Sequence, residues 1–167
     1  MCGIFGVITK EGSTFPQTKF KEASDALLTF SVNRGKESSG IAVCRKDTTD
    51  VYKAPCEATR LIKDPLYQKL FSSQSGSIRA IFGHARLVTN GDESNNDNNQ
   101  PVIKHELVGV HNGIIVNDTE LWNTHQDMNR DYDVDTEVLL SLIHKNRAKG
   151  ASLKESVSRA FTEIQGT

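Results

Sequence analysis

Apolar residues near the start of the chain follow first a strand-like and then a helix-like spacing. The short apolar run Ile4–Ile8 predicts a buried strand. Residues 11–16 contain Gly, Ser and Pro and predict a loop. The segment Thr18–Asn33 predicts an amphipathic helix, because its apolar side chains recur at helical spacing, at Phe20, Ala23, Leu27 and Phe30.

The next part of the chain reads as a hairpin, a helix and a central strand. Ile41–Arg45 and Val51–Ala54 are two short apolar segments separated by a polar turn, which indicates a hairpin. Glu57–Ser72 has helical character, and its internal proline should break or restart the helix. Ile78–His84 is apolar enough for a central strand, and we expect Gly83 to mark its end.

A long polar stretch separates this strand from the next. Residues 90–101 have no apolar residue before Pro101 and no periodicity, so we expect a mobile loop. A long loop inside a compact domain is typically a lid or binding loop. Glu106–Val110 predicts another strand, followed by a tight turn at 111–113 and extended residues at 114–116.

Three helices are predicted in the last third of the chain. The first follows Asn117 or Asp118, either of which can cap it, and the second opens at Asp135. The third begins with a capping box at residues 152–155. Because strands and helices come in blocks and do not alternate strictly, the order predicts a single-domain α+β fold with an antiparallel sheet.

Composition narrows the class of protein and of partner. A chain of 167 residues with a net charge of −1 has no electrostatic bias toward nucleic acid or membranes, so we expect neither as a partner. Without a secretory signal or a long apolar run, the cytoplasm is the expected location. The three cysteines have no paired CxxC spacing, which disfavours disulfides and a thiolate zinc site. We expect no cofactor and no metal.

Cys2 is an unusual position for a thiol. If Met1 is removed, Cys2 carries a thiol and a free α-amine on one residue. An α-amine with a reference pKa of about 7.7–8.0 can accept the proton of a thiol whose reference pKa is about 8.5. N-terminal nucleophiles are activated in this way. Position alone favours an accidental second-position cysteine, so the case depends on the residues that accompany it.

Three further features fit a cysteine nucleophile that attacks a small amide. Asn112-Gly113 at a turn offers a side-chain NH₂ and an accessible backbone N–H to a developing oxyanion. Arg86, just past the end of the predicted central strand, can bind a carboxylate through two hydrogen bonds. Asp135, at a helix start, can pair with an ammonium group. Arg86 and Asp135 together would suit a free α-amino acid.

Five windows together resemble the class II glutamine amidotransferases, whose glutaminase domains are N-terminal-nucleophile hydrolases. The resemblance is strongest to the glucosamine-6-phosphate synthase and amidophosphoribosyltransferase type, and it spans almost the whole chain in the family's order. The windows are Cys2-Gly3-Ile4-Phe5-Gly6-Val7, Arg34-Gly35-Lys36-Glu37-Ser38-Ser39-Gly40, residues 83–91 (GHARLVTNG), residues 111–117 (HNGIIVN) and Asp135-Thr136-Glu137-Val138.

The resemblance implies an αββα sandwich of antiparallel sheets and a specific chemistry. Cys2 looks like the nucleophile that takes the glutamine side-chain acyl group as a thioester and releases ammonia, and Asn112 and Gly113 look like the oxyanion hole. Ammonia would then pass to an acceptor held by a synthase domain or subunit. L-Glutamine is the expected substrate.

The remaining site residues are also implied by the resemblance. Arg86 and Thr89 correspond to groups that bind the glutamine α-carboxylate, and Asp135 to the group that binds its α-amine. Arg34, with Gly35, matches a supporting position near the nucleophile. The loop from Leu87 to Gln100 matches the glutamine loop that closes over substrate.

The chain departs from the family pattern in three places. Leu87 stands where the synthase type usually has an aromatic residue, and Asn90 stands where it has a histidine. Both changes put loop closure and affinity in doubt. The family's domains also continue with further strands beyond the helix that ends near Ile164, so we expect residues 1–167 to be a glutaminase domain that lacks its C-terminal strands. A fragment, a split protein and a reduced stand-alone variant stay open.

Two alternatives to glutamine hydrolysis stay open at the level of sequence. One is a catalytically weak or inactive module that binds glutamine or regulates a synthase partner. The other is a histidine-dependent cysteine hydrolase, because His111 lies beside Asn112 and His84 lies in a predicted strand.

Overall fold

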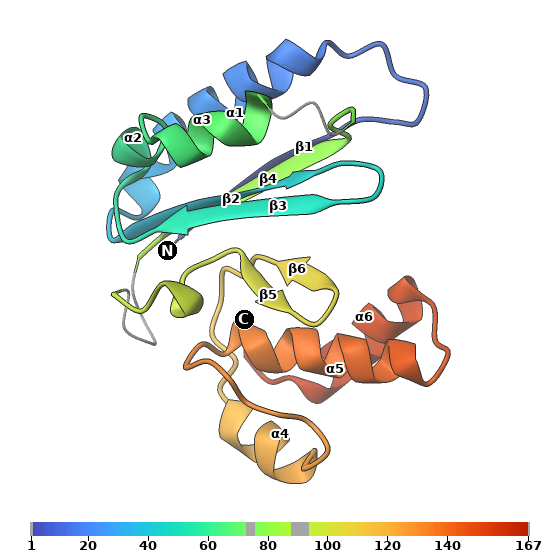
Figure 1. The fold of residues 1–167 in the computed structure, drawn as a ribbon. Coiled ribbons are helices and arrows are strands. Elements are labelled where there is room, and N and C mark those ends of the chain that lie inside the picture. Colours follow the sequence, from blue (N-terminus) through green and yellow to red (C-terminus); the bar gives the residue numbers. More distant parts are fainter. Residues whose placement is uncertain (1, 73–75, 88–93, 167) are drawn as a thin grey trace.

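The computed structural model describes residues 2–72, 76–87 and 94–166. These residues form layers: helices cover one face of a four-stranded sheet, and a two-stranded sheet with further helices lies against the other face (Figure 1). The arrangement is the expected α+β fold built from antiparallel sheets. Within the described residues, no helix is both long and apolar enough to cross a membrane.

The strands of the four-stranded sheet lie in the order β1-β4-β2-β3, so β4 and β2 are central. Every neighbouring pair is antiparallel. Its strands are β1 (Gly3–Ile8), β2 (Ser38–Cys44), β3 (Thr49–Ala54) and β4 (Ala80–Arg86). The register pairs Gly3 with Ala85 and Ser38 with Arg86. This pairing brings the start of the chain, the start of β2 and the end of β4 to the same edge of the sheet.

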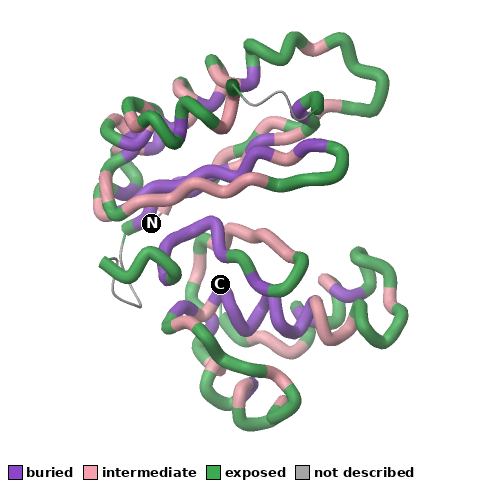
Figure 2. The backbone as a smooth tube through the Cα atoms, viewed as in Figure 1, coloured by how far each residue is buried: buried purple, intermediate pink, exposed green. Residues whose placement is uncertain are grey.

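Three helices cover the outer face of this sheet. They are α1 (Gln17–Ser31), α2 (Ala58–Leu61) and α3 (Pro65–Ser72), and a short 3₁₀ turn, η1 (Val32–Arg34), follows α1. The core between helices and sheet is formed by Phe20, Leu28, Ile41, Val43, Ala58, Leu61, Tyr67, Ile78 and Ile81. Figure 2 shows this buried band along the inner side of the helices and the central strands.

The second half of the structure packs a hairpin against helices. Its elements are η2 (Asn96–Asn98), β5 (Val102–Lys104), β6 (Leu107–Gly109), α4 (Asp118–Thr124), α5 (Thr136–Ala148) and α6 (Leu153–Glu163). The helix α5 is buried along most of its length, and its apolar side chains contact both the hairpin and α6. Fully buried Val102 and partly buried Leu107 link the hairpin to this core.

A close backbone approach joins the two halves at Gly40. A Cβ atom at Gly40 would lie 2.3 Å from the carbonyl oxygen of Gln100 and 2.9 Å from Cδ of Pro101. Glycine on β2 therefore allows the chain that leads into β5 to lie directly on the sheet.

Several expectations from the sequence are confirmed. The hairpin β2-β3, the helix α1 and the restart of a helix at Pro65 are present, and Asp64 Oδ1 accepts the Leu66 N–H at the start of α3. The predicted capping box is complete, since Ser152 and Glu155 each accept the other's backbone N–H.

Three expectations differ from the structure. Gly83 does not end its strand, because β4 continues to Arg86; a Cβ at Gly83 would lie 2.4 Å from Cζ of Phe5, so the glycine makes room for a ring. The predicted loop 90–101 is ordered in its second half, where Asn98 and Asn99 are buried and η2 forms. The strand expected at Glu106–Val110 is shorter and pairs with β5, which begins directly after Pro101.

His84 is a fully buried imidazole at the centre of the sheet. Neither ring nitrogen has a hydrogen-bond partner among the described residues. Burial lowers the pKa of His84 to about 4, and the nearby Arg86 cation acts in the same direction.

This burial predicts a pH-dependent stability. An unfolded chain protonates His84 below pH about 6.5, whereas the folded chain resists protonation until the pH falls to about 4. The free energy of unfolding should therefore keep its full value above pH 6.5. It should fall by about 3 kcal/mol as the pH drops toward 4. Urea denaturation across this range should show a shallower decline for His84→Gln than for the wild type. Identical declines would contradict the assignment.

Candidate active site

The N-terminal residue of the described chain lies directly against the predicted oxyanion residue. The backbone N–H of Cys2 donates to Asn112 Oδ1 at 3.2 Å, and Asn112 Nδ2 donates to the Cys2 carbonyl oxygen at 3.1 Å. These two residues are 110 positions apart in the sequence. The side-chain amide of Asn112 thus bridges both backbone groups of Cys2, and its predicted role in the oxyanion hole stays a prediction.

The thiol of Cys2 contacts the backbone just beyond β4. The Leu87 N–H donates to Cys2 Sγ at 3.3 Å, and Sγ lies 3.4 Å from the Leu87 carbonyl oxygen. Among the described residues, these backbone groups are the hydrogen-bond partners of Sγ, and no histidine is one of them. The described contacts therefore give the histidine-dependent alternative no support.

Gly35 makes this arrangement possible. A Cβ at Gly35 would lie 2.2 Å from the Arg86 carbonyl carbon and 2.6 Å from the Leu87 nitrogen. Its backbone is extended, so the requirement is for space and not for a left-handed conformation. Gly35 lets the peptide that contacts Cys2 Sγ pass closely, and its supporting role in the site stays a prediction.

An open pocket of about 430 Å³ adjoins Cys2 on the side of α1. Arg34 lies in its wall, and Phe30, 79% exposed, forms an apolar edge. The lining residues are Cys2, Gly3, Ile4, Phe5, Leu27, Phe30, Ser31, Arg34 and Asn112. Of the predicted site residues that the structure describes, Cys2, Arg34 and Asn112 line this pocket, whereas Arg86 and Asp135 do not.

Arg86 ends β4 with a buried side chain. Its Nη1 donates to Asn99 Oδ1 at 2.8 Å, so its guanidinium is held by the ordered end of the predicted loop. A guanidinium has five N–H donors, and one of them is used in this bond. Thr89, the second predicted carboxylate-binding residue, lies outside the described residues, as do Met1 and Asn90.

Asp135 faces the predicted oxyanion turn. Its Oδ2 accepts the Ile115 N–H at 2.7 Å, and its Oδ1 lies 4.0 Å from His111 Nδ1. The side chain makes no capping bond to α5, although Asp135 occupies the N-cap position. The carboxylate is 11% exposed and holds the far side of the turn that carries Asn112 and Gly113.

A cluster of charged side chains around the buried residues Lys104 and Glu137 binds the loop that precedes Asp135. Lys104 Nζ donates to Glu137 Oε1 at 2.6 Å and also pairs with Asp131. Glu137, fully buried, accepts the backbone N–H groups of Asp131 and Tyr132. Because the buried carboxylate is paired and fully hydrogen-bonded, it can fix the loop that precedes α5.

The chain resembles known proteins both in sequence and in fold. The family model of the glutamine amidotransferase domain matches residues 84–167, half of the chain. The chain belongs to the class II glutamine amidotransferases. It is 30% identical over its whole length to a glutamine–fructose-6-phosphate aminotransferase of Shouchella clausii, and 28% identical over its whole length to one of Staphylococcus aureus. The chain spans about a quarter (26%) of the length of these relatives.

Solved structures show the same fold for this glutamine amidotransferase domain. A glutamine phosphoribosylpyrophosphate amidotransferase from B. subtilis matches with a TM-score of 0.66 at 22% identity, over 99% of this chain and 33% of that one. A structure described as the allosteric regulatory enzyme of purine biosynthesis matches with a TM-score of 0.70 at 24% identity, over 99% and 34%. The predicted α+β fold with antiparallel sheets is therefore confirmed, and these solved structures share it.

Sequence reasoning missed a row of buried amides in the glutamine amidotransferase domain. Asn98 exchanges hydrogen bonds with Asp133, whose N–H donates to Asn98 Oδ1 at 3.0 Å. Asn99 accepts from Arg86, and Gln100 binds the backbone of His111. Their polar composition resembled a loop, and no local periodicity signalled contacts with such distant partners.

Lys53 on β3 anchors the same segment from the sheet. Its Nζ donates to the carbonyl oxygens of Asn99 at 2.7 Å and Asp97 at 3.2 Å. Burial lowers the pKa of Lys53 to about 8, and Arg86 acts in the same direction. The second half of the predicted glutamine loop is therefore fixed to β3 at one end of the site.

The close passage of the backbone at Gly35 predicts that a methyl group added there destabilises the fold more than one added at Gly6. Gly35→Ala must displace the backbone of Arg86 and Leu87, so it should lower the free energy of unfolding by about 3 kcal/mol or more. Gly6→Ala on β1 is the control, because its Cβ would lie no closer than 3.1 Å to a neighbour. Urea denaturation of both variants tests this, and equal losses would show that the Gly35 passage is not restrictive.

Proposed function

We propose that this domain hydrolyses the side-chain amide of L-glutamine through a thioester on Cys2 and delivers ammonia to an acceptor held by a synthase domain or subunit. The observation that carries the proposal is the double hydrogen bond between Asn112 and the backbone of Cys2. It joins the Asn112 amide to the backbone of Cys2 in a chain that belongs to the glutamine amidotransferase family, and this supports the proposal.

The first step uses the α-amine of Cys2, which removal of Met1 would expose. Asn112 Oδ1 accepts a hydrogen from the Cys2 nitrogen. This orients the amine so that its lone pair can take the thiol proton. The thiolate then attacks the amide carbon of glutamine and forms a carbon–sulfur bond, and the carbonyl electrons move onto the oxygen.

The oxyanion that results needs fixed hydrogen-bond donors. One N–H of Asn112 Nδ2 binds the Cys2 carbonyl oxygen, and its second N–H stays available for the oxyanion. The Gly113 N–H is the proposed second donor. Collapse of the intermediate breaks the carbon–nitrogen bond, and the leaving nitrogen takes a proton from the ammonium of Cys2. Water then hydrolyses the thioester to glutamate and regenerates the thiol.

Substrate recognition is proposed to use the charged residues around this centre. Arg86, with Thr89, binds the α-carboxylate, and Asp135 binds the α-amine. In support, Asp135 Oδ2 is used by the Ile115 N–H, whereas Oδ1 has no hydrogen bond among the described contacts. The pairing would select free α-amino acids over other amides.

A synthase partner follows from the length of the relatives. The curated relatives named glutamine–fructose-6-phosphate aminotransferase are about four times as long as this chain. We propose that the rest of such a protein, or a separate subunit, consumes the ammonia. The second candidate, a glutamine-binding or regulatory module with little turnover, is favoured by Leu87, which is 41% exposed where an aromatic residue would help the loop to seal.

The central test is glutamate release by the wild type and by Cys2→Ala, with the N-terminus of each read by mass spectrometry. Cys2→Ala should lose at least about 1,000-fold in kcat, because no other group forms the thioester. Cys44→Ala is the matched control, because Cys44 lies at the opposite end of the sheet, across from Ala80. Substantial release by Cys2→Ala would sink the mechanism, and no release by a correctly processed wild type would favour the binding module.

The role of Asp135 is tested by removing its charge while keeping its structural bond. Asp135→Asn retains an oxygen for the Ile115 N–H. We expect it to raise KM for glutamine at least about tenfold, and to change KM little for a primary amide that lacks the α-amine. Steady-state kinetics with both substrates decides this. Equal increases would remove Asp135 from the substrate site.

A further inference from the structure

Gln100 clamps the residue that precedes the oxyanion turn. Its Nε2 donates to the His111 carbonyl oxygen at 2.9 Å, and its Oε1 accepts the His111 N–H at 2.6 Å. Nε2 also lies 3.4 Å from Thr136 Oγ1, at the first residue of α5. The Gln100 residue is 8% exposed, so these bonds form away from solvent.

The two bonds restrict the direction in which the chain enters the turn. The N–H and the C=O of His111 belong to the two peptide planes on either side of its Cα. Binding both groups to one rigid amide limits the rotation of both planes. The second of these planes leads directly into Asn112, so its orientation sets where the Asn112 side chain begins.

Gln100 is in turn fixed to the sheet that carries the nucleophile. The backbone carbonyl oxygen of Gln100 lies so close to Gly40 that a Cβ atom at Gly40 would be 2.3 Å from it. Gly40 pairs with His84 on β4, and β4 pairs with β1, the strand that begins directly after Cys2. A continuous set of contacts therefore runs from the strand of the thiol, through Gln100, to the turn at Asn112.

We propose that Gln100 is a positioning residue that sets the distance between Cys2 and the oxyanion donors of Asn112 and Gly113. The inference rests on the proposed function. Gln100 touches neither the thiol nor the reacting amide and acts through His111. A neutral amide is suited to this place, because it supplies one donor and one acceptor without burying a charge. A displacement of about 1 Å at a catalytic group can cost about 100-fold in rate.

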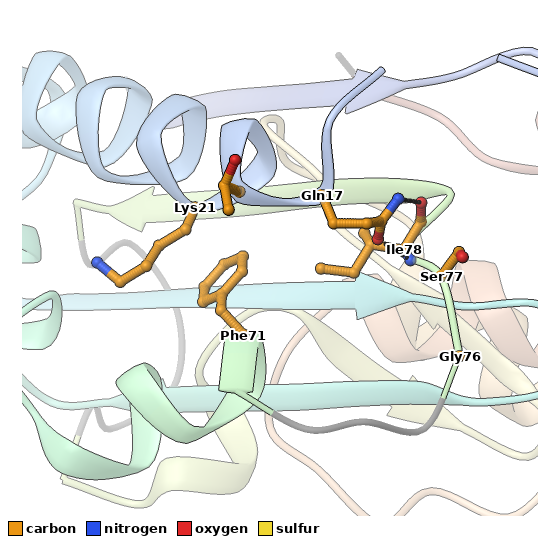
Figure 3. A pocket seen from close by; sticks show the side chains of 7 residues that line it. Gln17, Lys21, Phe71, Gly76, Ser77 and Ile78 are labelled. Atoms are coloured by element: carbon orange, nitrogen blue, oxygen red, sulfur yellow. Dashed lines mark hydrogen bonds between the residues drawn. The ribbon is translucent and has the colours of Figure 1, made fainter. Parts of the chain in front are cut away.

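The same chain contains a matched control. Gln17 at the start of α1 clamps Ile78 in the same way: its Nε2 donates to the Ile78 carbonyl oxygen at 3.3 Å, and its Oε1 accepts the Ile78 N–H at 2.5 Å. Figure 3 shows this pair in a pocket of about 480 Å³ between α1, α3 and residues 76–78. None of the described residues that line this pocket belongs to the proposed active site.

The kinetic test compares Gln100→Ala, Gln100→Glu and Gln17→Ala. Gln100→Glu keeps the shape and the acceptor but loses the donor to the His111 carbonyl. Both Gln100 variants should lose at least about tenfold in kcat with KM changed by less than about threefold. Gln17→Ala should keep its kcat within about twofold of the wild type. It should lower the melting temperature by about as much as Gln100→Ala does, because each removes a similar pair of hydrogen bonds. A kcat for the Gln100 variants equal to that of Gln17→Ala would overturn the proposal.

A second measurement does not depend on turnover. Amide hydrogen exchange should become at least about tenfold faster at His111 in Gln100→Ala and at Ile78 in Gln17→Ala. Exchange at Ile78 should be unchanged in Gln100→Ala, and exchange at His111 should be unchanged in Gln17→Ala. A wild type that hydrolyses no glutamine would defeat the proposed function, and the clamp on His111 would then be judged by exchange. Unchanged exchange at His111 in Gln100→Ala would overturn the positioning role whatever the activity.

Discussion

The site depends on the antiparallel pairing of β4 with both β1 and β2. This register sets the start of the chain beside the end of β4, so the thiol of Cys2 meets the backbone at Leu87. A slip by one residue would turn Arg86 to the opposite face of the sheet and move Leu87 away from Sγ. Every other site element is then placed relative to this sheet edge.

The second half of the molecule is joined to that edge mainly by neutral amides. Asn112 and Gln100 each provide a donor and an acceptor to backbone groups on distant segments, and Asn99 accepts from Arg86. A buried amide costs little once both of its groups are bonded, whereas a buried charge would need a partner of opposite sign. Among the described ion pairs near Asp135, the buried charge of Glu137 has a partner of opposite sign in Lys104.

The sequence predicted the elements whose signals are local, and part of the site. The capping box at Ser152, the hairpin and the proximity of Cys2 and Asn112 follow from residue patterns or from family windows. The ordered segment at Asn98–Gln100 and the strand after it did not, because their bonds reach backbone groups far along the chain and leave no periodic trace. Gly83 was misread for a related reason: a glycine required by the ring of Phe5 has the same sequence signal as a glycine at a strand end. The catalytic and binding roles of the site residues stay predictions.

The contact of Cys2 Sγ with Leu87 is made by backbone atoms, and this has a consequence for how the site tolerates change. Replacing Leu87 with another side chain leaves its N–H and C=O in place, so natural variation at this position can alter the entrance while the environment of the sulfur persists. An alanine scan would pass over such a residue. Proline, which lacks the N–H, is the substitution that would expose its importance.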